Sequence, residues 1–187
     1  MSDTESEPKV WPLVKKEAGE NLMLFKVRYD YMQNPRTDKV FKRLILETRS
    51  WVNIVAYTPD RDLIVVRQFR FGAGELTTEI PGGVMDPGEE HGDTARRELR
   101  EETGYTSTNW TYLGCVQPNP AFHDNLCHHW LAEDCELTDE LDLDEGEDIR
   151  VRVLSEDQIR AGIKGGDIRH SLVITALSHV IDLRTQA

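Results

Sequence analysis

Three glutamates near the middle of the chain have a spacing that concentrates negative charge. Glu101 and Glu102 follow Glu98 by three and four positions. On an α-helix the three carboxylates would therefore share one face within a turn of each other. If this face lies in a cleft, the carboxylates must be protonated or bind a cation. Mg²⁺ takes oxygen ligands and keeps water and substrate phosphates around it, so the cluster favours phosphate chemistry.

A solvated acidic helix face is the alternative interpretation of the same residues. Arg96, Arg97 and Arg100 lie in the same segment and balance part of its charge. Like-charge pairs on a solvated helix cost only about 0.2–0.5 kcal/mol each. The cluster alone leaves both interpretations open, and the residues around it decide between them.

Those surrounding residues form a longer motif. It reads GVMDPGE over residues 83–89 and, after seven residues, RELREETGY over residues 97–105. At every defined position it resembles the Nudix box of Nudix hydrolases, G-x5-E-x7-R-E-U-x-E-E-x-G-U, in which U is bulky and apolar or aromatic. The resemblance runs from about Trp51 to the C-terminus and implies a hydrolase.

Three further segments resemble one branch of this family, which hydrolyses ADP-ribose and other nucleoside diphosphate sugars. Residues 79–83, EIPGG, are similar to the E-x-P-(A/G)-G sequence that precedes the box in that branch, and Pro120 lies 15 residues beyond Tyr105 at a typical offset. Residues 144–151, DEGEDIRV, resemble the acidic catalytic loop of bacterial ADP-ribose pyrophosphatases.

The chain pattern predicts the elements that must hold these residues. Asp93 and Gly104 are typical of the beginning and end of a helix over 91–103, and Ser155 of a helix N-cap. A final helix is expected over 171–183. Strands are expected over 22–32 and 40–47, with a turn over 34–38 between them, and over 52–58, 63–69, 110–116, 128–135 and 149–154.

Strands and helices alternate without strict β-α-β order, which indicates helices covering a mixed sheet. The resemblance makes this an α/β protein, a Nudix-type α/β/α sandwich with a mixed β-sheet, preceded by a small N-terminal antiparallel β-sheet. We expect a disordered tail at 1–9, the N-terminal sheet at 10–49 and the catalytic domain at 50–187. Relatives with such a sheet are dimers that exchange it, so the resemblance implies a homodimer.

The resemblance also implies divalent metal ions, two or three per active site. Mg²⁺ is the expected ion, with Mn²⁺ as the alternative. The Gly82 carbonyl, Glu98 and Glu102 would hold them. Glu101 would be a further ligand, and Glu147 would complete a site.

A general base and an orienting arginine follow from the same comparison. Glu145 would take the proton from the attacking water, although many family members use a glutamate of the box instead. Arg97 would not touch substrate; a guanidinium among carboxylates is suited to orient Glu79, Glu89 or Glu101 by bidentate pairing.

Substrate recognition is assigned to residues around the box, with Glu79 among them. Arg70 resembles the arginine of this branch that contacts the diphosphate. Trp51, beside Arg49, would stack on the base or else pack in the core. Phe122 and His123 would line the sugar side or else belong to a polar loop. Residues 118–123, PNPAFH, depart from the small residues common there, so the preferred sugar stays open.

Composition excludes several other classes. The 187 residues contain 22 Lys and Arg against 34 Asp and Glu, a net charge of −12. This charge repels nucleic acid, and the longest apolar runs are far below the ~20 residues of a membrane span. The polar N-terminus is unlike a signal peptide and three cysteines form no disulfide framework, which favours the cytoplasm. Cys127 beside His128 and His129 could suggest zinc, but the spacing matches no ligand pattern.

The sequence thus predicts an enzyme that uses Mg²⁺ to cleave a nucleoside diphosphate sugar, a small molecule, into a nucleoside monophosphate and a sugar phosphate. One alternative is a Nudix hydrolase of nucleoside triphosphates or dinucleoside polyphosphates. Another is a sensor that binds ADP-ribose-type ligands without turnover. The intact box carboxylates oppose the sensor, and the EIPGG segment opposes the triphosphate hydrolase.

Overall fold

The computed structural model describes residues 9–184 and divides the chain into two compact units. One unit comprises the N-terminal residues to Thr48 together with Asn119–Asn125, and the other comprises Arg49–Pro118 and the chain from Leu126 onward. The tail predicted at 1–9 lies almost entirely outside the described residues.

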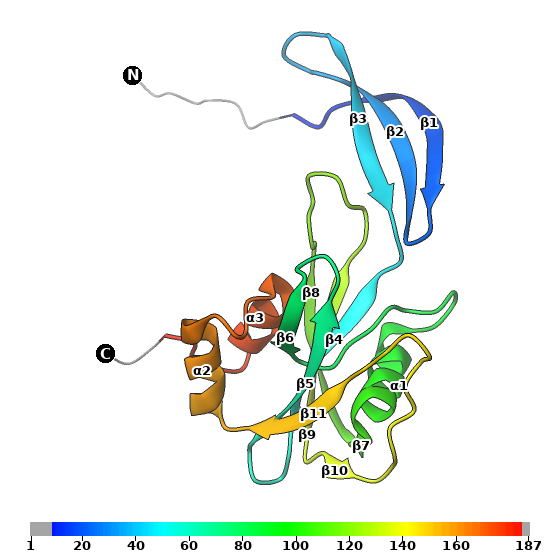
Figure 1. Ribbon diagram of the computed structural model, residues 1–187. Helices are drawn as coiled ribbons and strands as arrows, with labels where there is room; N and C mark the ends of the chain where they lie inside the picture. Colours follow the sequence, from blue (N-terminus) through cyan, green and yellow to red (C-terminus); the bar gives the residue numbers. More distant parts are fainter. Residues whose placement is uncertain (1–8, 185–187) are drawn as a thin grey trace, which may run out of the picture. The chain divides into compact units, whose positions relative to one another are not determined.

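The N-terminal unit is a three-stranded antiparallel sheet in the order β1-β2-β3 (Figure 1). Its strands are β1 (Leu13–Leu22), β2 (Phe25–Gln33) and β3 (Val40–Glu47). The turn predicted over 34–38 is confirmed, since the Asn34 carbonyl accepts from the Asp38 N–H at 2.8 Å. The sequence did not indicate β1, because this strand is mostly polar and exposed and has no apolar alternation.

A distant loop completes this unit. The Leu46 N–H donates to the Phe122 carbonyl at 2.7 Å, and the rings of Phe25 and His123 lie 5.6 Å apart. Asp124 accepts from the Thr48 N–H at 3.3 Å. Segment 119–125 is therefore part of the sheet unit, although it begins 72 positions after β3 ends.

The second unit contains a six-stranded mixed sheet in the order β11-β5-β4-β9-β8, with β6 also paired to β5. Strands β4 and β9 run parallel, and the other pairs are antiparallel. A separate pair joins β7 (Tyr105–Thr106) to β10 (Glu136–Leu137). The sheet consists of β4 (Trp51–Tyr57), β5 (Leu63–Arg70), β6 (Glu75–Glu79), β8 (Asn109–Val116), β9 (Cys127–Glu133) and β11 (Arg150–Leu154).

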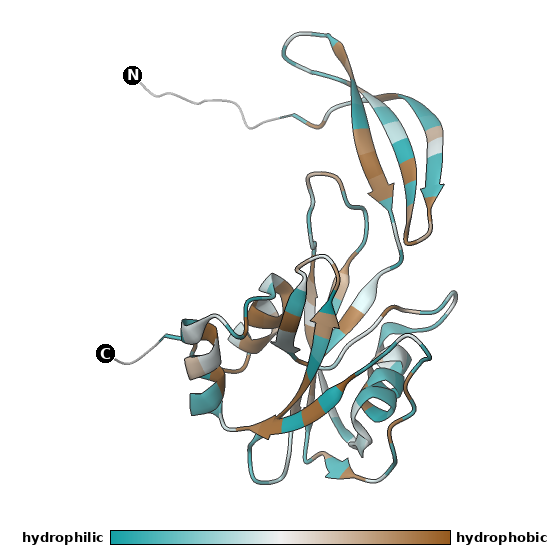
Figure 2. Cartoon of the chain, in the orientation of Figure 1, coloured by the Kyte–Doolittle hydropathy of each residue, from teal (hydrophilic) through white to brown (hydrophobic). Residues whose placement is uncertain are grey.

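Helices cover both faces of this sheet, which confirms the α/β/α arrangement (Figure 1). Helix α1 (His91–Thr103) packs on Val52, Ile54 and other even-numbered positions of β4. Helices α2 (Glu156–Gly165) and α3 (Ser171–Ser178) pack on the opposite face, against Val55 and Tyr57. Both faces of β4 are buried, so this strand is apolar at every position except Asn53. Figure 2 shows the hydropathy of each residue on the sheet. Within the described residues, no helix is long and apolar enough to cross a membrane.

Three details differ from the sequence-based expectation. Strands β6, β7 and β10 were not predicted, because each is short and largely polar. Helix α3 ends at Ser178 rather than at 183, because the next N–H groups bond in tight turns to Ala176 and Leu177. Apolar residues that pack on the core continue through 183 and imitate a helical pattern. As an alternative to zinc, the sequence suggests Cys127 and Trp130 as core positions of one strand with the histidines on or near its other face. On β9, Cys127 and His129 instead share one buried face while Trp130 lies on the other, since side chains alternate along a strand.

The N-terminus of α2 has the cap that the sequence predicts. The Ser155 side chain accepts from the Gln158 N–H, and the Gln158 side chain accepts from the Ser155 N–H at 2.8 Å, which is a complete capping box. We expect Ser155→Ala to lower the free energy of unfolding by about 1 kcal/mol, measured by urea denaturation. Ser171→Ala, at an exposed position of α3, is the matched control and should change it much less.

Candidate active site

Helix α1, the loop before it and the loop before β11 surround one cavity of about 540 Å³. Seven carboxylates and three guanidinium groups line it, a net charge of −4 if all are ionised. The carboxylates are Asp86, Glu98, Glu101, Glu102, Asp142, Asp144 and Glu147, and the guanidinium groups are those of Arg49, Arg70 and Arg97. The predicted helix face is thus a cavity wall and not a solvated surface.

Two glutamates of α1 are deeply placed in this wall. The Glu98 side chain is 12% exposed and Glu102 is 4% exposed. Burial, together with repulsion from neighbouring carboxylates, raises the pKa of Glu98 to about 7 and that of Glu102 to about 8. The hydrogen bond from the Gly82 N–H to Glu102, at 2.9 Å, opposes this rise only in part. These carboxylates therefore lack enough positive partners within the described protein.

The backbone of Gly82 and Gly83 approaches both glutamates closely. A Cβ atom on Gly82 would lie 2.2 Å from the Val52 carbonyl oxygen, and one on Gly83 would lie 2.3 Å from the carboxylate carbon of Glu98. Such distances are far below van der Waals contact. Only glycine lets the chain pass between β4 and α1 here.

This close approach gives a direct test. We expect Gly83→Ala to push the Glu98 carboxylate aside and to lower kcat/KM by ~100-fold, because a shift of about 1 Å in an active-site group has effects of this size. The fold should survive, since a flexible side chain can move. Gly72→Ala is the control, as a Cβ there meets nothing within 4 Å. Equal activity of both variants would contradict a functional position for Glu98.

Arg97 contacts several carboxylates of the cluster at once. It holds Glu89 with two nitrogens at 3.0 Å each, as predicted, and it also donates to Glu98 at 2.8 Å and to Glu101 at 3.1 Å. Its hydrogen bonds lower the pKa of Glu89 to about 2. The predicted alternative of a pair with Glu79 is wrong, because that carboxylate is held elsewhere.

Glu79 forms a separate ion-pair cluster. Arg70 donates to its two oxygens at 2.9 and 2.8 Å, and His170 lies 3.1 Å from the second. Burial opposes the charge of Glu79, but these hydrogen bonds outweigh it and hold its pKa far below the usual range. No local sequence signal indicates His170, which is the N-cap residue of α3 and lies 91 positions further along the chain.

Some residues of the acidic loop before β11 line the cavity and others do not. Asp142, Asp144 and Glu147 line the cavity, whereas Glu145 is exposed and is not among the lining residues. The loop is tied to α1 because the Asp142 N–H donates to the Glu101 carbonyl at 3.0 Å. Asp142 and Asp144 were not predicted as site residues. Asp144 begins the segment 144–151 that resembles the acidic catalytic loop, whereas the sequence signal for Asp142 is the acidic run alone.

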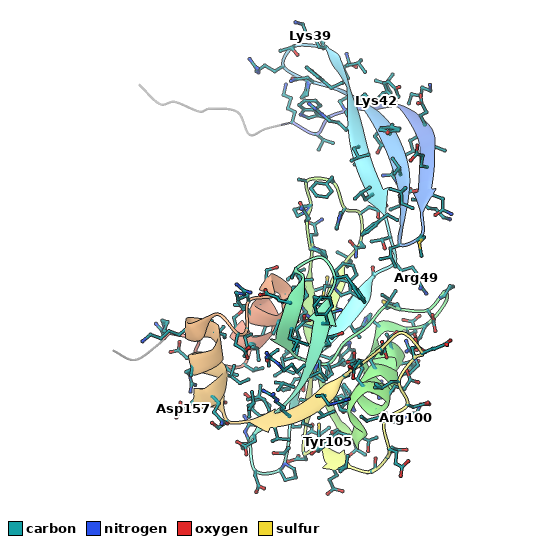
Figure 3. All side chains as sticks on the ribbon, in the orientation of Figure 1. Lys39, Lys42, Arg49, Arg100, Tyr105 and Asp157 are labelled. Atoms are coloured by element: carbon teal, nitrogen blue, oxygen red, sulfur yellow. The ribbon has the colours of Figure 1, made fainter. Side chains whose placement is uncertain are left out.

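Two predicted substrate residues lie at the edge of the cluster. Arg49, labelled in Figure 3, lines the acidic cavity and donates to Asp86 at 3.0 Å and to the Met85 carbonyl. Trp51 begins β4 and bridges to Val84. With Glu79 and Arg70 it lines an adjoining cavity of about 370 Å³ on the other side of Gly82 and Gly83.

The chain matches the NUDIX domain model over residues 47–175. The chain belongs to the Nudix family. The match covers more than half of the sequence and confirms the family that the box indicates. This protein is therefore a Nudix hydrolase, and the carboxylates of α1 are those of its Nudix box.

Individual relatives agree with this membership. An ADP-ribose pyrophosphatase of Bacillus subtilis (strain 168) is 38% identical over 124 residues, 65% of this chain and 67% of that protein. A methanol dehydrogenase activator of Bacillus methanolicus is 29% identical over 156 residues, 83% of this chain and 84% of that protein. A crystal structure of an ADP compounds hydrolase, 23% identical, aligns with a TM-score of 0.82 over 94% of both chains and shows the same fold.

The Nudix cavity contains the donor set for a hard divalent cation. Its lining carboxylates exceed its guanidinium groups by four, and burial makes two of them costly to ionise without a counter-charge. Among the described residues, no three His, Cys, Asp or Glu side chains are gathered closely enough to hold an ion. Carboxylates beside the Gly82–Gly83 backbone fit a hard cation that also keeps water and substrate phosphate among its ligands, as is typical of Mg²⁺.

Two predicted substrate residues belong to the other unit. Phe122 and His123 lie in the segment that packs with the three-stranded sheet. Their predicted contact with the sugar is untested and stays a prediction. The Nudix unit itself brings together the predicted Gly82, Glu98 and Glu102 with the other box residues.

Proposed function

We propose that this Nudix hydrolase cleaves the pyrophosphate bond of ADP-ribose or of another nucleoside diphosphate sugar, giving a nucleoside monophosphate and a sugar phosphate. The supporting observation is a cavity with an excess of four carboxylates that adjoins the Gly82–Gly83 backbone of the EIPGG segment. The name of the Bacillus subtilis relative, ADP-ribose pyrophosphatase, agrees with this substrate class.

The proposed cofactor is Mg²⁺, with Mn²⁺ as the alternative, at two or three ions per active site. Glu98, Glu102 and the Gly82 carbonyl would hold it, with Glu101 and Glu147 as further ligands. When bound, the ions would neutralise charge on the phosphoryl oxygens and lower the pKa of the attacking water. The buried, high-pKa carboxylates of α1 support this ligand set.

The chain's own cations have two distinct tasks in this proposal. Arg70 lines both the acidic cavity and its neighbour, so it can bind the diphosphate between them. Glu79 fixes its guanidinium plane through two hydrogen bonds, and His170 in turn contacts Glu79. Arg97 acts on other residues, because its contacts hold Glu89, Glu98 and Glu101 in place.

The proposed general base is Glu145, which must move with its loop from an exposed position to take a proton from water. Glu147, which already lines the cavity, is the competing residue. We expect Glu145→Gln to lower kcat by ~10²–10⁴-fold with little change in KM, as loss of a general base does. The measurement is steady-state kinetics of Glu145→Gln beside Glu147→Gln. Unchanged kcat in Glu145→Gln would contradict its role as the base. Because Glu147 is also a proposed metal ligand, the base role would pass to Glu147 only if Glu147→Gln lowers kcat and leaves the Mg²⁺ dependence unchanged.

Recognition of the two ends of the substrate is assigned to the remaining predicted residues. Trp51 would stack on the base, with Arg49 and Glu79 beside it. Phe122 and His123 would face the sugar. Trp51 lies next to the diphosphate-binding Arg70 in the adjoining cavity, which supports its part of this assignment.

The proposed quaternary structure is a homodimer exchanging the N-terminal sheet of residues 10–49, with residues 50–187 as the catalytic domain. Neither nucleic acid nor membrane is a proposed partner, and the proposed compartment is the cytoplasm. The net charge of −12 supports the absence of a nucleic-acid partner. The exposed apolar side chains of β1 and β3, such as Leu13 and Leu44, support the dimer. A monomer mass in light scattering at micromolar concentration would contradict the dimer.

Product identification by mass spectrometry tests the reaction. The protein is incubated with Mg²⁺ and ADP-ribose, ADP-glucose, GDP-mannose, UDP-glucose, ATP or a dinucleoside polyphosphate, with a chelator control. We expect nucleoside monophosphate and sugar phosphate from at least one sugar nucleotide, and none in the chelator. Pyrophosphate released only from ATP would establish the triphosphate alternative, and ligand binding without any product would establish the sensor.

A further inference from the structure

Helix α1 presents a second chemical face beside the one that carries the box carboxylates, and Arg97 lies at the border of the two. Asp93, Arg96, Arg97 and Arg100 recur at helical spacing along it. They line a cavity of about 500 Å³ together with Glu89 and Trp110. Three guanidinium groups and two carboxylates give this cavity a net charge of +1. The acidic cavity has a net charge of −4, and the whole chain has a net charge of −12.

Two of the three arginines, Arg96 and Arg100, have weaker carboxylate contacts than Arg97 and carry the positive charge available to a ligand. Arg97 neutralises Glu89 through its bidentate pair and turns toward the acidic cavity. Arg96 has its nearest carboxylate at 3.7 Å, on Asp93, whose side chain is 73% exposed. Arg100 reaches Glu101 at 3.3 Å through one nitrogen. Both guanidinium groups are about half exposed, so they retain hydrogen-bond donors for a ligand.

An aromatic wall holds one of these arginines in place. The Arg96 guanidinium lies 5.3 Å from the centroid of the Trp110 ring, and its Nη1 donates to the Gly92 carbonyl at 2.8 Å. The Trp110 indole N–H in turn donates to the Ser107 carbonyl at 2.8 Å. The Arg96 guanidinium is thus held against the Trp110 ring, and Arg100 lies one helical turn away. Two guanidinium groups in this arrangement can donate hydrogen bonds to a tetrahedral oxyanion.

We propose that this cavity is a second anion site, distinct from the acidic cavity, which binds the dianionic phosphate of a phosphate monoester or free phosphate. Arg96 and Arg100 donate to the phosphate oxygens. Figure 3 labels Arg100 on α1. Glu101 competes with the anion for Arg100, because the same side chain hydrogen-bonds Arg97 through one oxygen and Arg100 through the other.

Calorimetry in the presence of a chelator removes metal-dependent binding at the acidic cavity, and the loss of affinity in variants of Arg96 and Arg100 assigns the remaining binding to this site. Inorganic phosphate and AMP are titrated separately into the full-length protein. We expect binding that weakens ~10-fold in Arg96→Ala and in Arg100→Ala, since each removes charge-assisted hydrogen bonds. Glu101→Gln should bind about threefold more tightly, because it frees Arg100. If AMP binds more tightly than inorganic phosphate, the ligand is a nucleotide. If the two bind equally, the ligand is free phosphate.

Two variants with the same charge changes serve as controls. Arg36→Ala removes an exposed arginine of the other unit, and Glu90→Gln removes an exposed carboxylate that does not line the cavity. Neither should change the affinity. No binding of either anion in the chelator would overturn the proposal, as would unchanged affinity in Arg96→Ala. The result is independent of the proposed hydrolysis, which is measured with Mg²⁺ and by its products.

Discussion

Glu98→Gln should fold normally and lose at least ~100-fold in kcat/KM, because the proposed metal-ligand role of Glu98 would contribute several kcal/mol to phosphoryl transfer. The side chain is 12% exposed and faces the cavity backbone at Gly83. Glutamine keeps its shape and one oxygen but removes the charge that would bind the proposed cation. The measurement is steady-state hydrolysis of ADP-ribose in Mg²⁺, with circular dichroism to verify the fold.

Glu90→Gln is the matched control for this variant. Glu90 is the N-cap residue of α1, yet its side chain makes no capping hydrogen bond and is exposed. It should keep full activity. Turnover of Glu98→Gln at the rate of the unaltered protein would contradict the proposed metal cluster, and impaired Glu90→Gln would show a general effect of charge on α1.

Arg97→Ala should impair both stability and catalysis. It leaves Glu89, Glu98 and Glu101 without the guanidinium that contacts all three, and these side chains are 18%, 12% and 26% exposed. We expect a loss of about 2–3 kcal/mol in the free energy of unfolding, less than for a fully buried pair. Activity should fall ~100-fold because the carboxylates lose their positions. Urea denaturation and steady-state kinetics provide the two measurements.

Arg100→Ala is the comparison on the same helix. Its one carboxylate contact is Glu101 at 3.3 Å and the side chain is 48% exposed, so stability should change by less than about 1 kcal/mol. Arg97→Lys separates charge from geometry, since lysine keeps the charge but not the forked donors. Full activity of Arg97→Ala would show that the carboxylates are held by other contacts.

The sequence by itself determined the elements whose signals are local. The helix over 91–103, its glycine end at Gly104 and the Ser155 cap depend on neighbouring residues, and the structure has all three. The Nudix box is equally local, because its spacing places Glu98 and Glu102 one turn apart on α1. Family, fold class and the box carboxylates were therefore predictable without coordinates.

Only the tertiary structure decided which distant residues meet. His170 contacts Glu79 although 91 positions separate them, and segment 119–125 packs with the N-terminal sheet. These contacts depend on packing and on the pairing of buried charge, which no local sequence periodicity indicates. Strand β1 forms by pairing with β2 despite its polar sequence. Burial likewise separates the two faces of α1 into an acidic cavity and a basic one, since the same helix packs between different neighbours on each side.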